Sequence, residues 1–330
     1  YVQGDLQEAG AQFESARAML SDQALAVPLP ISAINHSQLA LLEWAAWNYE
    51  SAKKHGDTAL TQCTESVGAE HPLAAPVLAT LATLYRNQSL NAKAEAYYFR
   101  AQSIIRRTYG EQHPYSAAIL VRLAQLHLAR KNHREAESAI GQAIEILEKV
   151  FGSEHPAVAV ALNVQGELEL DRNHARDARR PLERALKILE STYGRSHPSV
   201  ATVLRNLAAI ETSPRTYKRG IALCEEAIGI LEPVLGPAHP ELARTQFTMA
   251  SLYLEQKEYA LARPLAERCL ALREKALAPF HPDLAAACEL YATVLENLSE
   301  PEPQKAAELR ARGAAILRRH AQEDRVDAPG

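Results

Sequence analysis

The chain has 330 residues, of which 23% are charged, and its formal net charge is −4. A balance this close to neutral excludes a general attraction to nucleic acid or to a membrane surface. No run of about 18 apolar residues occurs, so the sequence predicts no membrane insertion. The four cysteines have no Cys-x-x-Cys spacing, which predicts buried free thiols and favours a cytoplasmic location, with the periplasm left open.

Residues 1–28 precede the regular part of the chain. The spacing of Ala9, Phe13, Ala16 and Leu20 predicts the second helix of a truncated repeat, followed by a spacer. The chain starts with Tyr1 and not with Met, so we expect a processed protein or a fragment with further sequence upstream.

From residue 71 onward the dipeptide His-Pro recurs every 42 residues. A fixed period of this size predicts a repeat architecture in which neighbouring units share a core. Counting back one period reaches Leu29-Pro30, which indicates a divergent unit before the six regular ones. We therefore expect seven tandem repeats over residues 29–322, with starts near 29, 71, 113, 155, 197, 239 and 281.

Each repeat carries small residues at fixed positions and apolar residues at helical spacing, which predicts two helices per repeat. Small residues in one register indicate closely packed backbones, at the fifth, the twelfth and the thirty-first position. The fifth is alanine in every unit, from Ala33 to Ala285. The twelfth positions are Ala40, Ala82, Ala124, Gly166, Ala208, Ala250 and Ala292. The thirty-first positions are Ala59, Ala101, Ala143, Ala185, Ala227, Cys269 and Ala311.

The boundary between repeats reads Gly-x-x-His-Pro, as at Gly110 to Pro114. The glycine is expected to form a left-handed C-cap, the histidine to be extended, and the proline to open the next helix. After the last repeat boundary, a proline-rich turn before Pro303 predicts a final helix over about 303 to 319. Residues 323–330 are expected to form a disordered tail.

Several segments carry a resemblance to a known family: Tyr109-Gly-Glu-Gln-His-Pro, Ala201-Thr-Val-Leu-Arg-Asn-Leu-Ala and Pro181-Leu-Glu-Arg-Ala-Leu-Lys-Ile. The pattern resembles the tetratricopeptide repeat in its 42-residue form, typical of kinesin light chains and many bacterial proteins. The resemblance implies an all-α solenoid of αα-hairpins, wound as a right-handed superhelix. It also implies that the first helix of each repeat lines the concave surface.

Four positions of the first helices, the sixth, ninth, tenth and thirteenth, are expected to face this surface. The predicted peptide-binding groove consists of Thr80, Thr83, Arg122, Gln125, Asn163, Arg205, Asn206, Arg244 and Thr248. Arginines suit a carboxylate-bearing peptide because the guanidinium fork pairs with two oxygens, and the resemblance implies that asparagines clamp a peptide backbone. The alternative is that these residues form only the solvated side of amphipathic helices.

The sequence predicts no catalytic residue, no cofactor and no metal site. The periodic histidines lie one repeat apart, and no G-x-S-x-G or G-x-G-x-x-G motif occurs. The leading hypothesis is a non-enzymatic scaffold that binds an extended, acidic peptide in its concave groove. One alternative is a sensor or autoinhibitory module of a larger signalling protein with an upstream effector domain, and another is a homo-oligomer formed through the terminal repeats.

Overall fold

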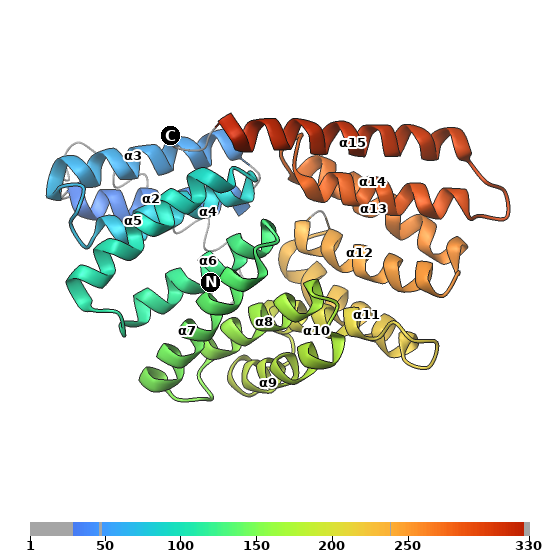
Figure 1. Cartoon of the computed structure of the whole chain (residues 1–330), viewed down its shortest axis with the longest axis horizontal. Coiled ribbons are helices and arrows are strands. Elements are labelled where there is room, and N and C mark those ends of the chain that lie inside the picture. Colours follow the sequence, from blue (N-terminus) through green and yellow to red (C-terminus); the bar gives the residue numbers. More distant parts are fainter. Residues whose placement is uncertain (1–28, 46–47, 238, 327–330) are drawn as a thin grey trace. The chain divides into compact units, whose positions relative to one another are not determined.

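The computed structural model describes residues 29–45, 48–237 and 239–326, which form fourteen helices and no strand (Figure 1). The helix predicted within residues 1–28 lies outside this part. The chain forms two compact units, residues 1–150 with 324–330, and residues 151–323. The boundary falls at the end of a second helix, between the repeats that start at His113 and His155.

The first unit consists of helices that alternate as the first and second helix of a repeat. They are α2 (Leu29–Ala45), α3 (Tyr49–Val67), α4 (Ala74–Asn87), α5 (Asn91–Tyr109), α6 (Pro114–Ala129) and α7 (His133–Phe151). Tyr98 lies at 0% exposure in an apolar cluster that joins side chains of α2 to α6.

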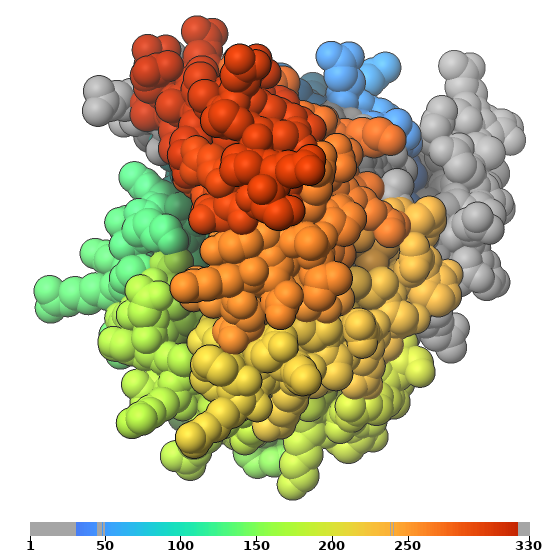
Figure 2. Space-filling model, turned by 90° about the vertical axis from the view of Figure 1, so that its right-hand side faces the viewer, coloured from blue at the N-terminus to red at the C-terminus, as the bar shows by residue number. Residues whose placement is uncertain are grey.

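The second unit continues the alternation. Its helices are α8 (Pro156–Asp171), α9 (Ala175–Tyr193), α10 (Pro198–Ile210), α11 (Tyr217–Leu235), α12 (Pro240–Glu255), α13 (Tyr259–Ala276), α14 (Pro282–Glu296) and α15 (Pro303–Val326). These repeats stack in sequence order, which Figure 2 shows as layers from yellow-green to red. None of the helices in the described part of the chain has the length and apolar character needed to cross a bilayer.

The small positions lie in the core, as predicted, with one exception. The fifth and twelfth positions are buried in every repeat, and so are the thirty-first positions up to Cys269. Ala311, however, is exposed, so its predicted place in the core was wrong. The earlier second helices begin 42 residues apart, up to Tyr259, whereas α15 begins at Pro303 and not at residue 301. The proline-rich turn thus shifts the register by two residues, and Gly313 takes the buried small position.

The histidine of the His-Pro pair has a local role that the sequence analysis did not predict: it caps the following helix. At five boundaries it is extended, and its Nδ1 accepts the backbone N–H two residues further on, at 3.1 to 3.2 Å. The proline then opens α6, α8, α10, α12 and α14. After His71 a turn intervenes, and α4 begins at Ala74. The dipeptide is therefore a helix start signal made from a side-chain cap and a preset φ.

The glycines that end the second helices have φ between 79° and 90°, which confirms that a positive φ is required there. Their ψ is 155° to 169° at Gly68, Gly110, Gly194 and Gly236, so the conformation differs from the predicted left-handed helical cap. It is the extended region of positive φ that only glycine adopts readily.

The turns inside the repeats contain true left-handed residues at Ser89, Lys131, Asn173 and Lys257, with φ of 60° to 64°. The residue after each of them donates its N–H to a carbonyl five residues back, at 2.8 to 2.9 Å. These bonds close the first helices. The last helix runs to Val326, beyond the predicted end near 319 and into the segment expected to be disordered, because no glycine or proline occurs between residues 320 and 326.

Candidate functional site

The first helices of the second unit form its inner layer. Helices α8, α10, α12 and α14 contact one another in succession, whereas α9, α11 and α13 each contact the first helices on either side of them in the chain. Because neighbouring first helices approach more closely than neighbouring second helices, the stack curves with the first helices on the inside. We call the solvent side of α8, α10 and α12 the inner face.

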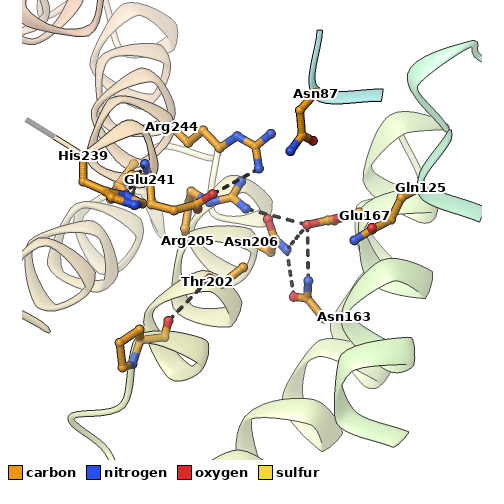
Figure 3. A network of polar contacts seen from close by, with 12 residues as sticks. Asn87, Gln125, Asn163, Glu167, Thr202, Arg205, Asn206, His239, Glu241 and Arg244 are labelled. Carbon is orange, nitrogen blue, oxygen red and sulfur yellow. Dashed lines mark hydrogen bonds and ion pairs between the residues drawn. The ribbon is translucent and has the colours of Figure 1, made fainter. Parts of the chain in front are cut away.

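Two repeats are joined on the inner face by amide and carboxylate side chains (Figure 3). The amide nitrogen of Asn206 donates to Asn163 Oδ1 at 2.9 Å and to Glu167 Oε1 at 3.1 Å. Asn163 Nδ2 donates to the same carboxylate oxygen at 3.2 Å, and Arg205 lies 3.7 Å from it. Asn206 is 2% exposed and Asn163 is 9% exposed, so both amides are largely enclosed by this network.

Arg244 is the most accessible arginine among the predicted groove residues of this unit. Its side chain is 51% exposed, against 14% for Arg205, and it donates to Glu241 Oε1 at 3.3 Å. The Glu241 charge raises the pKa of Arg244, with smaller contributions from Asp283 and Glu167. Burial acts to raise the pKa of Glu241, but the charges of Arg244, Arg205 and His239 outweigh it and lower that pKa.

A further acid and base extend this arrangement toward α14. The backbone oxygen of Asp283 accepts from Arg273, which is 6% exposed and lies over the Phe247 ring at 4.5 Å. Burial opposes ionisation of Asp283, but the charges of His281, Arg273, Arg244 and Arg205 lower its pKa. The inner face and the adjoining start of α14 thus bring three carboxylates, those of Glu167, Glu241 and Asp283, near the guanidinium groups of Arg205, Arg244 and Arg273. Arginine there is already partnered, so an incoming carboxylate has to share it with the protein's own acids.

The predicted groove residues of the first unit also contact one another. Thr83 Oγ1 accepts from Arg122 at 2.8 Å and lies 3.0 Å from the Tyr98 hydroxyl. Gln125 accepts from Arg86 at 2.5 Å. Each of these bonds, Thr83 with Arg122 and Gln125 with Arg86, joins α4 to α6.

Two predicted residues, Thr80 and Thr248, are 8% and 9% exposed, and Thr248 donates to the Arg244 carbonyl within α12. These threonines belong to the packed side of the first helices more than to an open surface.

The sequence analysis missed Arg86, Glu241 and Asp283, the partners of predicted residues. Glu241 and Asp283 share one position, directly after His-Pro, where a first-turn carboxylate is stabilised by the helix dipole. Glu241 also lies three residues before Arg244, a spacing at which helical side chains meet. These two signals were present in the sequence.

The four cysteines lie in the core. Cys63, Cys224, Cys269 and Cys288 are free and buried, as predicted, and burial raises the pKa of Cys224 to about 12 and that of Cys269 to about 11. Such thiols are protonated and unreactive at neutral pH.

One group in the described part of the chain has the composition of a metal site. Glu169, His174 and Asp177 place potential ligand atoms within 4.8 Å of one another at the turn between α8 and α9. Glu169 already accepts from Arg172 at 3.3 Å and lies 3.1 Å from His174. The carboxylate is thus already engaged by protein side chains.

Fold and inner face together define an α-helical repeat protein whose repeats are αα-hairpins. The family model described as tetratricopeptide repeat matches residues 79–149, 116–191 and 199–275, more than half of the chain. The chain therefore belongs to the tetratricopeptide repeat family. No curated protein matches it significantly.

Comparison with solved structures found several that are similar to this chain. A Rap protein complexed with competence and sporulation factor is 16% identical, with 93% of this chain and 81% of that chain covered and a TM-score of 0.68. A signal transduction ATPase with numerous domains and a tetratricopeptide repeat sensor, from Pyrococcus horikoshii, is 15% identical over 91% of this chain and 45% of that chain, with a TM-score of 0.54. A putative kinesin light chain from Podosopora anserina is 23% identical over 63% and 97%, with a TM-score of 0.46.

Proposed function

We propose that this protein is a non-enzymatic scaffold that binds an extended, acidic peptide on the inner face of its second unit. The observation that carries the proposal is Arg244, whose side chain is half exposed on a face where amide and charged side chains cluster. Arg205 adds a second positive charge nearby, although its side chain is only 14% exposed. An incoming carboxylate is a suitable acceptor for the exposed Arg244 side chain. The tetratricopeptide fold, which is typical of protein-interaction scaffolds, supports the same assignment.

The geometry limits how such a peptide binds. Glu241 and Glu167 already neutralise part of the charge of the two arginines, so the attraction is local and does not extend over the whole face. We therefore expect binding that depends on the position of the peptide carboxylates and weakens with salt. A uniformly acidic polymer should bind little more tightly than a short peptide, because Glu167, Glu241 and Asp283 repel its additional carboxylates.

Charge reversal at Arg244 tests the proposal. An acidic peptide library is screened against the whole chain, and the best binder is titrated against Arg244→Glu, Arg244→Gln and Arg205→Glu. We expect each variant to weaken binding about tenfold or more, because a charge-assisted contact is lost. Circular dichroism checks that the variants are folded.

Arg268→Glu is a matched control on α13. Arg268 is 50% exposed and pairs with Glu232 at 3.3 Å, which reproduces the exposure and the ion pair of Arg244 on a second helix. Its reversal should leave binding unchanged. Binding that survives both Arg205→Glu and Arg244→Glu would mean that the groove is assigned to the wrong face.

A second candidate is a sensor module within a larger signalling protein. It is favoured by the match to the Pyrococcus horikoshii ATPase, of which this chain covers 45%. The test is to read the coding sequence upstream of Tyr1. A phosphate-binding loop there supports the sensor module, and a signal peptide alone contradicts it.

A further inference from the structure

The turn between α8 and α9 brings two carboxylates and an imidazole together. Glu169 lies in the last turn of α8, His174 directly precedes α9, and Asp177 lies in the first turn of α9. One potential ligand atom of each residue lies within 4.8 Å of the other two, and Glu169 Oε2 is 3.1 Å from His174 Nδ1. A helix end, a turn and a helix start thus direct three groups of metal-binding type to one place.

The backbone of this turn holds the three residues in place. Asn173 is left-handed with φ of 63°, and the N–H of His174 donates to the Glu169 carbonyl at 2.8 Å. The N–H of Asp177 donates to the His174 carbonyl at 3.0 Å. The His174 side chain makes no bond to a helix N–H, whereas the histidines of the His-Pro pairs use Nδ1 to cap a helix. Its Nδ1 is turned toward Glu169 instead.

The positions of the two acids hold a different kind of pair in the neighbouring repeats. Of the repeats that start at residues 71, 113, 155, 197 and 239, only the one that starts at 155 has two acids there. The other pairs are Tyr85 with Lys93, His127 with Glu135, Glu211 with Arg219, and Tyr253 with Leu261. Lys93 Nζ lies over the Tyr85 ring, and Arg219 lies 3.6 Å from Glu211. Two carboxylates at this place repel each other unless a cation lies between them.

We infer that Glu169, His174 and Asp177 form a binding site for a zinc ion. Imidazole nitrogen and carboxylate oxygen bind Zn²⁺ at about 2.0–2.2 Å, so two such ligands at a tetrahedral angle lie about 3.4 Å apart. The 3.1 Å between Glu169 Oε2 and His174 Nδ1 is close to that separation, and the exposed Asp177 side chain can rotate to supply the third ligand. Zn²⁺ takes the place of the proton between the first two atoms, which leaves to water, and the imidazole keeps its other proton on Nε2. A water molecule completes the coordination.

Arg172 positions one of the carboxylates for this role. Its guanidinium group lies 3.3 Å from Glu169 Oε1, the oxygen that does not face His174. The Glu169 side chain is only 16% exposed, so this ion pair and the surrounding atoms limit its rotation. A hydrogen bond to one oxygen of a ligating carboxylate orients the group and leaves the other oxygen for the metal.

The surrounding charges favour zinc over magnesium or calcium. Arg176 and Arg180 line the groove that also contains Glu169 and Asp177, and their charges oppose a cation that is held mainly by electrostatic attraction. Magnesium and calcium are held in that way, by oxygen ligands and water. An imidazole nitrogen is instead a ligand that suits zinc. We therefore expect Zn²⁺ to bind here, and Mg²⁺ or Ca²⁺ at the same concentration not to bind.

The test measures Zn²⁺ binding to the whole chain by isothermal titration calorimetry, with the absorption spectrum of added Co²⁺ as a direct report of coordination. The unchanged chain is compared with His174→Ala and Asp177→Asn. We expect each variant to weaken Zn²⁺ binding about tenfold or more, since even a residue that only orients a ligand contributes that much. Zn²⁺ should raise the Tm of the unchanged chain more than that of either variant, because an ion that binds only the folded chain stabilises it.

Two further variants sharpen the comparison. Asp177→Arg introduces the residue type that pairs with Glu211 in the next repeat, so it should remove the effect of Zn²⁺ on Tm while circular dichroism shows an unchanged fold. His133→Ala is the matched control, because His133 lies at the corresponding turn one repeat earlier, where α7 begins. Its removal should leave Zn²⁺ binding unchanged.

Four results would overturn the inference. They are that the unchanged chain binds no Zn²⁺, that His174→Ala and Asp177→Asn bind it with unchanged affinity, that His133→Ala weakens binding equally, or that Mg²⁺ or Ca²⁺ raises Tm through the same residues. Each of these results leaves the inner-face proposal intact, because that proposal rests on Arg244 and on peptide binding.

Discussion

Replacing Gln246 with leucine should stabilise the second unit. Gln246 lies on α12 with 2% exposure, and its Oε1 is buried without a partner among the described residues. The same position holds leucine in four other repeats, Leu78, Leu120, Leu162 and Leu204, all buried. An unsatisfied buried acceptor costs about 1–3 kcal/mol, and leucine has a similar size, so we expect a gain of about 1–2 kcal/mol in the free energy of unfolding.

The assay is thermal unfolding followed by circular dichroism, together with urea titration. For a unit of this size each kcal/mol shifts Tm by about 2–4 °C, so the expected rise is measurable. The reciprocal variant Leu204→Gln places the same amide one repeat earlier and should destabilise by about 2 kcal/mol or more. A lower Tm for Gln246→Leu would refute the reasoning, because it would mean that the buried oxygen has a partner.

Three further outcomes can be measured by the same unfolding assays. Gly229→Ala should raise stability by about 1 kcal/mol, since a Cβ there meets nothing within 4 Å and alanine favours the helix. Gly166→Ala should lower the free energy of unfolding, because its Cβ would lie 2.4 Å from Cγ of the fully buried Leu182. If Gly166→Ala raised the free energy of unfolding as Gly229→Ala is expected to, the packing around Gly166 would be contradicted. Burial lowers the pKa of His281 from 6.5 to about 4, so below pH 6.5 this histidine takes up a proton in the unfolded chain but not in the folded one. The free energy of unfolding should therefore fall by up to about 3 kcal/mol between pH 6.5 and pH 4. The variant His281→Asn, which keeps a capping oxygen, should flatten this part of the plot of Tm against pH.

The fold class and most helix boundaries could be predicted from the sequence, because the signals for them are local. A glycine that needs positive φ, a capping histidine and a proline at the first helical position act within a few residues of one another. Repetition at a fixed period then places the small core positions, and the structure confirmed them up to Cys269. The left-handed conformation of Lys131 and Lys257 in their turns escaped prediction because neither residue is glycine, and bonds to the preceding helix hold them.

For the candidate site, the sequence predicted only which side of each first helix a residue faces. Periodicity indicates that Arg205 and Asn206 face the inner side of α10, but their partner Glu167 comes from the preceding repeat. Likewise, spacing alone does not distinguish half-exposed Arg244 from buried Thr248, since both lie on the same helix within four residues.

The sequence by itself thus determined an all-α repeat solenoid and where most of its helices begin and end. Only the tertiary structure decided which charges are neutralised within the protein and which, as at Arg176 and Arg180, have no partner among the described residues. The physical reason is range. Helix starts and stops depend on backbone bonds between near neighbours, whereas ion pairing and exposure depend on residues that packing brings together from different helices.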